Sequence, residues 1–184
     1  MNQKSAIYSL SIASLLSFTA STNDPTTKLN YALKHLDSKE AKTQLIAEFP
    51  RDAKAFKEFC QERRTVLKDC SGLFENGVQK LIPKSEYAEP LAEILAGLVT
   101  EVKYGADAPN YLQRAWLTLC QGQPKAFVAA VENLPSAKQE KSLKYMSAYL
   151  HKPNDNKVLP CIEALEQDGE KEISARLKKY LKGH

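Results

Sequence analysis

Four cysteines are the residues of this sequence with the most definite chemistry. They are Cys60, Cys70, Cys120 and Cys161. An even number of cysteines is typical of exported proteins, whose thiols pair in an oxidising compartment. The sequence has no CxxC pair and no cysteine–histidine cluster with zinc-ligand spacing. We therefore predict structural disulfides at these positions and no metal site, with three pairings open.

The pairing depends on whether residues 52–82 form one helix. Apolar residues recur there at alternating spacings of 4 and 3, which a single helix would satisfy. In that helix Cys60 and Cys70 would lie about 15 Å apart along the axis, whereas disulfide-bonded Cα atoms lie within about 7 Å. Residues 61–64 offer no apolar side chain, and a break at 61–65 would permit a Cys60–Cys70 bridge. Cys120 and Cys161 would then pair with each other. In a continuous helix, Cys60 and Cys70 would instead each pair with Cys120 or Cys161.

Acid–base catalysis has few candidate residues. The three histidines are His35, His151 and His184. None has a cysteine, serine or carboxylate at a motif spacing, and HExxH, GxSxG, Walker and GxGxxG patterns are absent. Glu89/Glu93 and Glu166/Glu170 are carboxylate pairs four residues apart, which we interpret as solvated helix faces. We predict no catalytic residue and no cofactor.

Residues 83–120 show the strongest helical pattern and the only tryptophan. Two apolar stripes recur at helical spacing, one made of Leu91, Leu95, Leu98 and Val102 and the other of Leu112, Ala115, Trp116 and Leu119. Because the connection between the stripes is short, we predict an antiparallel helical hairpin with both stripes in the core.

The ends of these two helices have recognisable signals. Ser85 is a plausible N-cap, and Pro90 is expected in the first turn of its helix. Gly105 suits a left-handed C-terminal cap. Asp107 can cap the second helix, with Pro109 in its first turn.

The turn of the hairpin is the candidate ligand or partner surface. Its residues are Tyr104, Asp107, Tyr111 and Trp116. Trp116 beside Tyr111 could stack on a sugar or a ligand ring, although its place in the apolar stripe favours a core position.

The remaining chain reads as short helices separated by turn residues. Asp37 with Glu40, and Ser136 with Gln139, have the spacing of capping boxes. Pro and Gly residues punctuate the second half of the chain, and no segment alternates with a period of two. We predict an all-α fold, namely a single-domain bundle or array of about eight short antiparallel helices, stapled by disulfides.

Composition excludes one large class of function. The 184 residues include 26 basic and 22 acidic side chains, for a formal net charge of +4. The lysines are scattered and form no basic block, so we predict no nucleic-acid binding.

The N-terminal residues resemble a targeting signal. Lys4 precedes an uncharged apolar run over residues 6–20, which is too short and too rich in serine for a transmembrane helix. We predict a signal peptide at 1–20 and one helical domain at 21–184, in a periplasmic or secreted protein with no membrane contact after signal removal. The alternative is a buried N-terminal helix.

The order of segments resembles a group of small, uncharacterised, secreted bacterial α-helical proteins. The resemblance rests on Phe49-Pro50 followed by Phe56, on Ile82-Pro83-Lys84, on residues 104–113 (YGADAPNYLQ) and on residues 136–140 (SAKQE). It implies an all-α fold and a helix break after Cys60, and it implies no activity. The chain departs from the pattern after Tyr145.

Two functions follow as hypotheses. The first is an exported, non-enzymatic helical protein that acts by binding another protein, as an inhibitor or an immunity protein does. The alternative is a small-ligand-binding protein or an enzyme with an unrecognised site near the turn at 104–111.

Overall fold

The computed structural model describes residues 25–62, 72–103, 107–147 and 157–182. The described residues form α-helices, one π-helical segment and no strand, which confirms the all-α prediction. The elements in chain order are α1 (Pro25–Lys34), α2 (Lys39–Glu48), α3 (Ala53–Glu62), η1 (Gly72–Val78), α4 (Gln79–Leu81), α5 (Ser85–Glu101), α6 (Asp107–Gly122), α7 (Pro124–Glu132), α8 (Ser136–Ser147), α9 (Leu159–Gln167) and α10 (Lys171–Lys182).

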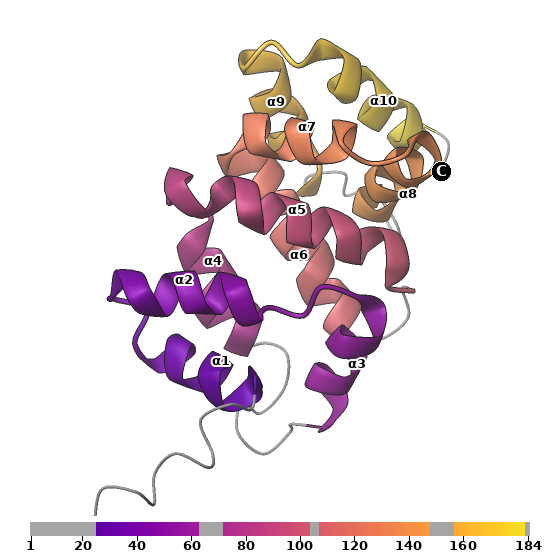
Figure 1. Ribbon diagram of the computed structural model, residues 1–184. Helices are drawn as coiled ribbons and strands as arrows, with labels where there is room; N and C mark the ends of the chain where they lie inside the picture. Colours follow the sequence, from indigo (N-terminus) through magenta and orange to yellow (C-terminus); the bar gives the residue numbers. More distant parts are fainter. Residues whose placement is uncertain (1–24, 63–71, 104–106, 148–156, 183–184) are drawn as a thin grey trace, which may run out of the picture.

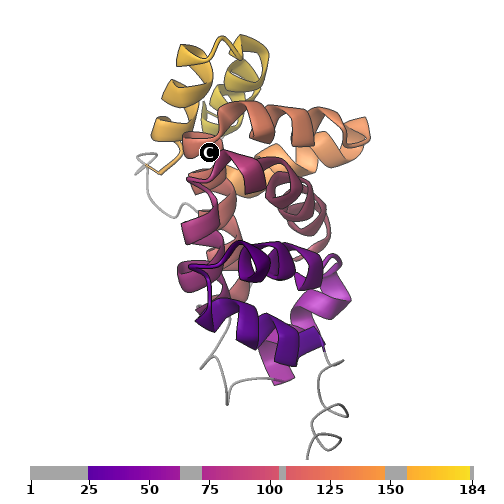
Figure 2. The same cartoon turned by 60° about the vertical axis from the view of Figure 1, so that its left-hand side comes forward.

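The helices form an elongated array. The α1–α2 pair lies at one end and the α9–α10 pair at the other, with α5 and α6 between them (Figures 1 and 2). Helix α5 packs against α2, α6, α7 and α8, so it lies at the centre of the array. The buried apolar side chains join in one core cluster.

The two predicted apolar stripes are in this core. Leu91, Leu95 and Leu98 of α5 are fully buried, as are Leu112, Ala115, Trp116 and Leu119 of α6. The two helices pack on each other, as the hairpin prediction required. Helix α6 ends at Gly122 and α7 begins at Pro124, where the sequence predicted a break.

Several predicted helix starts are displaced. Ser38, not Asp37, caps α2, and its Oγ accepts from the Ala41 amide at 3.1 Å. The N-cap of α5 is Lys84, and Ser85 is the first helical residue. Pro90 therefore lies beyond the first turn of α5, where its ring removes one backbone hydrogen bond.

A π-helical segment replaces the regular helix expected before residue 82. Its buried residues are Leu73, Phe74, Gly77 and Val78, which form two adjacent pairs four residues apart. Gly77 lies inside this segment, where an added Cβ would approach Leu33 Cδ2 to 2.8 Å and Leu45 Cδ2 to 3.1 Å. The glycine thus allows α1 and α2 to pack closely on η1.

The turn between α9 and α10 is built around Gly169. Gly169 has φ of +89°, in the left-handed region. Its amide donates to the Glu166 carbonyl oxygen at 3.2 Å, and the Glu170 amide donates to the Leu165 carbonyl oxygen at 2.8 Å. These two bonds complete a Schellman motif, with the glycine at the position that disfavours a Cβ.

Candidate functional site

The predicted surface at the 104–111 turn is only partly described. Tyr104 lies outside the described residues, and so does the side chain of Asp107. Tyr111 is half-buried, and its ring stacks on Phe74 with centroids 6.4 Å apart and planes 12° apart. Tyr111 therefore joins α6 to η1.

Trp116 is a core residue. Its side chain is fully buried, and its ring contacts Phe127 of α7 with centroids 4.4 Å apart. Tyr111 and Trp116 thus use their rings for internal packing, and Trp116 offers no exposed face for a sugar or a ligand ring. The apolar stripe of α6 is the sequence signal that indicated this position.

Gln113 has a structural role that the sequence reading missed. Its amide nitrogen donates to the carbonyl oxygens of Tyr145 at 2.9 Å and of Met146 at 3.2 Å. These carbonyls belong to the last turn of α8, where backbone acceptors lack helical partners. The contact spans more than thirty residues of sequence, so no local pattern could have indicated it.

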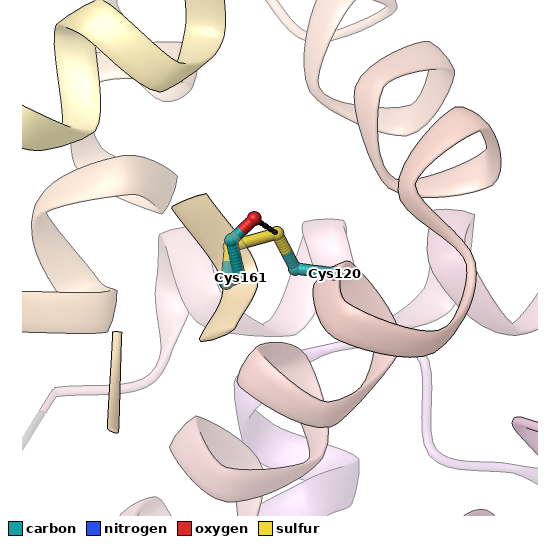
Figure 3. The surroundings of a disulfide bond; sticks show 2 residues. All are labelled: Cys120 and Cys161. Atoms are coloured by element: carbon teal, nitrogen blue, oxygen red, sulfur yellow. Dashed lines mark hydrogen bonds between the residues drawn. A yellow bond between two sulfur atoms is a disulfide. The ribbon is translucent and has the colours of Figure 1, made fainter. Parts of the chain in front are cut away.

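A disulfide joins Cys120 of α6 to Cys161 of α9, with Cα atoms 5.3 Å apart (Figure 3). Both residues are buried. Cys120 Sγ also lies 3.8 Å from the Cys161 carbonyl oxygen (dashed in Figure 3), a contact without a shared proton because the sulfur is oxidised. The bond excludes the pairing that a continuous helix over residues 52–82 would have required.

The other predicted bridge, between Cys60 and Cys70, lies only partly in the described residues. Cys60 is disulfide-bonded. Cys70 and the predicted helix break at 61–65 fall largely outside the described residues, as does the signal peptide at 1–20. Helix α3 is described as far as Glu62.

In the described residues, neither the histidines nor the other potential metal ligands cluster into a catalytic or metal site. His35 is exposed and lies against Tyr31, with ring centroids 4.4 Å apart. His151 and His184 lie outside the described residues. Within the described chain, no three His, Cys, Asp or Glu side chains are placed to hold a metal ion.

Glutamates occupy the exposed side of α5. Glu86, Glu89, Glu93 and Glu101 are all exposed, and only Glu101 forms an ion pair in the described structure, with Lys138 at 3.4 Å. Beside them, Tyr87 is buried where α5 meets α2. Burial and the Glu86 carboxylate raise the pKa of its hydroxyl, while Thr43 of α2 acts in the opposite direction. The sequence indicated the solvated Glu89/Glu93 face but gave no reason to single out Glu86 or Tyr87.

The α9–α10 pair carries a second charged contact. Lys178 and Ser174 both donate to Glu166 Oε1. These hydrogen bonds, that from Lys178 first, lower the pKa of Glu166. The contact links the two C-terminal helices on their exposed side.

Comparison with known proteins gives no family for this chain. No protein-family model, curated protein or solved structure matches it. Among the described helices, none is long and apolar enough to cross a membrane.

Proposed function

We propose that this chain is an exported, non-enzymatic helical protein that acts by binding another protein, in the manner of an inhibitor or an immunity protein. Its secretion to the periplasm or beyond belongs to the same proposal. The resemblance to small secreted helical proteins noted in the sequence supports it without supplying an activity.

The observation that carries the proposal is the buried Cys120–Cys161 bridge within a closely packed helical body. A disulfide is compatible with a periplasmic or extracellular protein, because cytosolic thiols are kept reduced. The bridge fixes α9 to α6 across a sequence separation of 41 residues. Such a body presents its surface already ordered, and an ordered surface loses little conformational entropy when a partner binds.

The placement of the aromatic residues gives further support. Trp116 and Tyr111, the residues best suited to stack on a small ligand, pack against Phe127 and Phe74 instead. The described part of the 104–111 turn therefore adds nothing in favour of the ligand-binding alternative.

Affinity capture of the tagged, oxidised protein from the exported fraction of its own organism tests the proposal. We expect one other protein to be enriched in a fixed ratio. The matched control is the Cys120→Ser/Cys161→Ser variant, which keeps the surface residues and loosens the fold. Equal recovery of background proteins by the tag alone and by the oxidised protein would contradict the proposal.

A further inference from the structure

The last two helices form a unit at one end of the molecule. Helices α9 and α10 lie side by side at the end opposite to α1 and α2 (Figures 1 and 2). Glu166 of α9 accepts hydrogen bonds from Ser174 and Lys178 of α10, so the pair has contacts of its own. The outer elements of an array have neighbours on fewer sides than central ones, and local opening favours such elements. We therefore expect α9 and α10 to open together when this end of the array opens.

Three kinds of contact hold this pair to the rest of the molecule. Its apolar side chains join the common core. Two ion pairs lie outside the core: Lys125 Nζ is 3.6 Å from Asp168 Oδ1, and Arg176 Nη2 is 3.3 Å from Glu140 Oε1. Both are partly exposed to water, where an ion pair contributes little stability. The third contact is covalent, because the Cys120–Cys161 disulfide ties the first turn of α9 to α6 (Figure 3).

Burial of this disulfide couples its chemistry to the position of α9. Cys120 is 0% exposed and Cys161 is 1% exposed. A disulfide is reduced when a thiolate attacks one of its sulfur atoms, which requires access to that atom. A reductant therefore reaches the bridge only when α9 moves away from α6. Opening exposes the bridge, and reduction removes the covalent link that limits opening.

We infer that the α9–α10 pair is a redox-sensitive closing unit, which the oxidised bridge holds shut and which opens as one piece after reduction. A dithiol reductant supplies two electrons and two protons: its own sulfurs become a disulfide, and Cys120 and Cys161 become free thiols. In an oxidising compartment the pair stays closed on α6. The inference goes beyond the proposed function, since it requires no partner protein.

The first test measures how fast the bridge is reduced in the folded protein. Dithiothreitol is added to the full oxidised chain under native conditions, and the thiols of Cys120 and Cys161 are alkylated and quantified by peptide mapping over time. The test variant is Leu165→Ala, one turn after Cys161 on the buried face of α9. The matched control is Leu45→Ala in α2, at the opposite end of the array. Both leucines are 0% exposed, so the two variants remove the same side chain from equally buried positions.

We expect Leu165→Ala to be reduced at least about tenfold faster than the unmodified protein, because loss of a buried leucine favours the open pair. Leu45→Ala should stay within about threefold of the unmodified rate, because it leaves the α9–α10 end intact. Equal acceleration in the two variants would show that the bridge is reached only by unfolding of the whole molecule and would overturn the inference. An unchanged rate in Leu165→Ala would do the same.

The second test asks whether loss of the bridge acts mainly on this pair. Amide hydrogen exchange, read by mass spectrometry, is compared between the oxidised protein and the Cys120→Ser/Cys161→Ser variant. In the variant, amides of α9 and α10 should exchange at least about tenfold faster than those of α5 in the same molecule, a wider gap than in the oxidised protein. Exchange of all three helices at one rate, or the same gap in both proteins, would contradict a separately opening unit.

The two proposals can fail independently. The reduction rates are measured on chains that keep both cysteines, so they test the inference even where the cysteine variant does not fold. Neither measurement uses a partner protein. Absence of a native partner would therefore count against the proposed function alone, and equal reduction rates of the two leucine variants would count against the closing unit alone.

Discussion

Three glutamine side chains donate hydrogen bonds to backbone carbonyl oxygens at the end of a helix other than their own. Besides Gln113, the Gln123 amide donates to the Ile82 carbonyl oxygen at 3.0 Å, just beyond α4. Gln139 donates to the carbonyl oxygens of Glu132 at 3.2 Å and Leu134 at 2.9 Å, where α7 ends. A helix leaves its last carbonyls without backbone partners. In this array short helices end often, and long amide side chains from neighbouring elements supply the missing donors.

Replacing Gln113 by alanine should lower the free energy of unfolding by about 1–3 kcal/mol, because the buried hydrogen bonds that Gln113 donates to the end of α8 are lost. Gln121→Ala is the matched control, since Gln121 is exposed on the same helix. Urea unfolding followed by circular dichroism measures both. Equal stability of the two variants would show that Gln113 does not hold α8.

Two glycines should respond to alanine in opposite directions. Gly169→Ala places a Cβ at φ of +89° and should destabilise the protein by about 1 kcal/mol or more. Gly97→Ala lies within α5, where the new Cβ would lie 3.9 Å from its nearest neighbour, the Arg51 carbonyl oxygen, so it should stabilise by about 0.5–1 kcal/mol. Shifts of the same sign in urea unfolding would contradict the assignment of the Schellman turn.

Helix caps can be predicted from sequence when the capping hydrogen bond forms between residues close in the chain and no other element competes for it. Asp52 lies just before α3, and its Oδ1 accepts from the Ala55 amide at 2.8 Å, as an N-cap residue does. The expected capping box of Ser136 with Gln139 was wrong. Ser136 is the first residue of α8, and the Gln139 side chain bonds elsewhere: its Nε2 donates to carbonyl oxygens at the end of α7 and its Oε1 accepts from Arg176. The spacing of a capping box cannot show a nearby helix end that competes for the same amide.

At the scale of elements, the apolar period located the helices well because their core faces are broad. The stripes of α5 and α6 are buried as expected, and Gly122, Pro124 and Gly169 mark real helix boundaries. The π-helical η1 was missed, since alternating spacings of 4 and 3 describe an ordinary α-helix and no sequence signal distinguishes the wider turn. At the candidate turn, Trp116 is in the core because its stripe faces α7.

The α9–α10 contact should make stability depend on acidity. Hydrogen bonds from Lys178 and Ser174 lower the folded-state pKa of Glu166. A lowered pKa contributes stability at pH above the ordinary glutamate value of about 4.3, and this contribution is lost as pH falls through the lowered folded-state value. Glu166→Gln should therefore lose stability near neutral pH and converge with the unmodified protein in acid.

The measurement is urea unfolding over a series of pH values. Glu163→Gln is the control, because Glu163 is exposed on the same helix without a partner in the described structure. A constant difference between Glu166→Gln and the unmodified protein at every pH would contradict the assigned contact.

At the scale of the whole molecule, the Cys120–Cys161 disulfide links α6 to α9 and closes the segment of chain between them into a covalent loop. Its sequence separation of 41 residues corresponds to about 4 kcal/mol in the chain-entropy description of disulfides. Cys120→Ser/Cys161→Ser should lower the urea midpoint accordingly, and peptide mapping of the unmodified protein should recover the Cys120- and Cys161-containing peptides joined. Recovery of Cys120 linked to Cys60 or Cys70 would contradict the structure.

The central claim is that the folded, oxidised chain works in a complex with another protein, and the size of the native particle tests it most directly. The exported fraction of the organism, separated under non-denaturing conditions, should contain this chain at a mass above its own, together with a second, different protein in a fixed ratio. Its presence only as free chain, or only as an assembly of identical copies, would contradict the account.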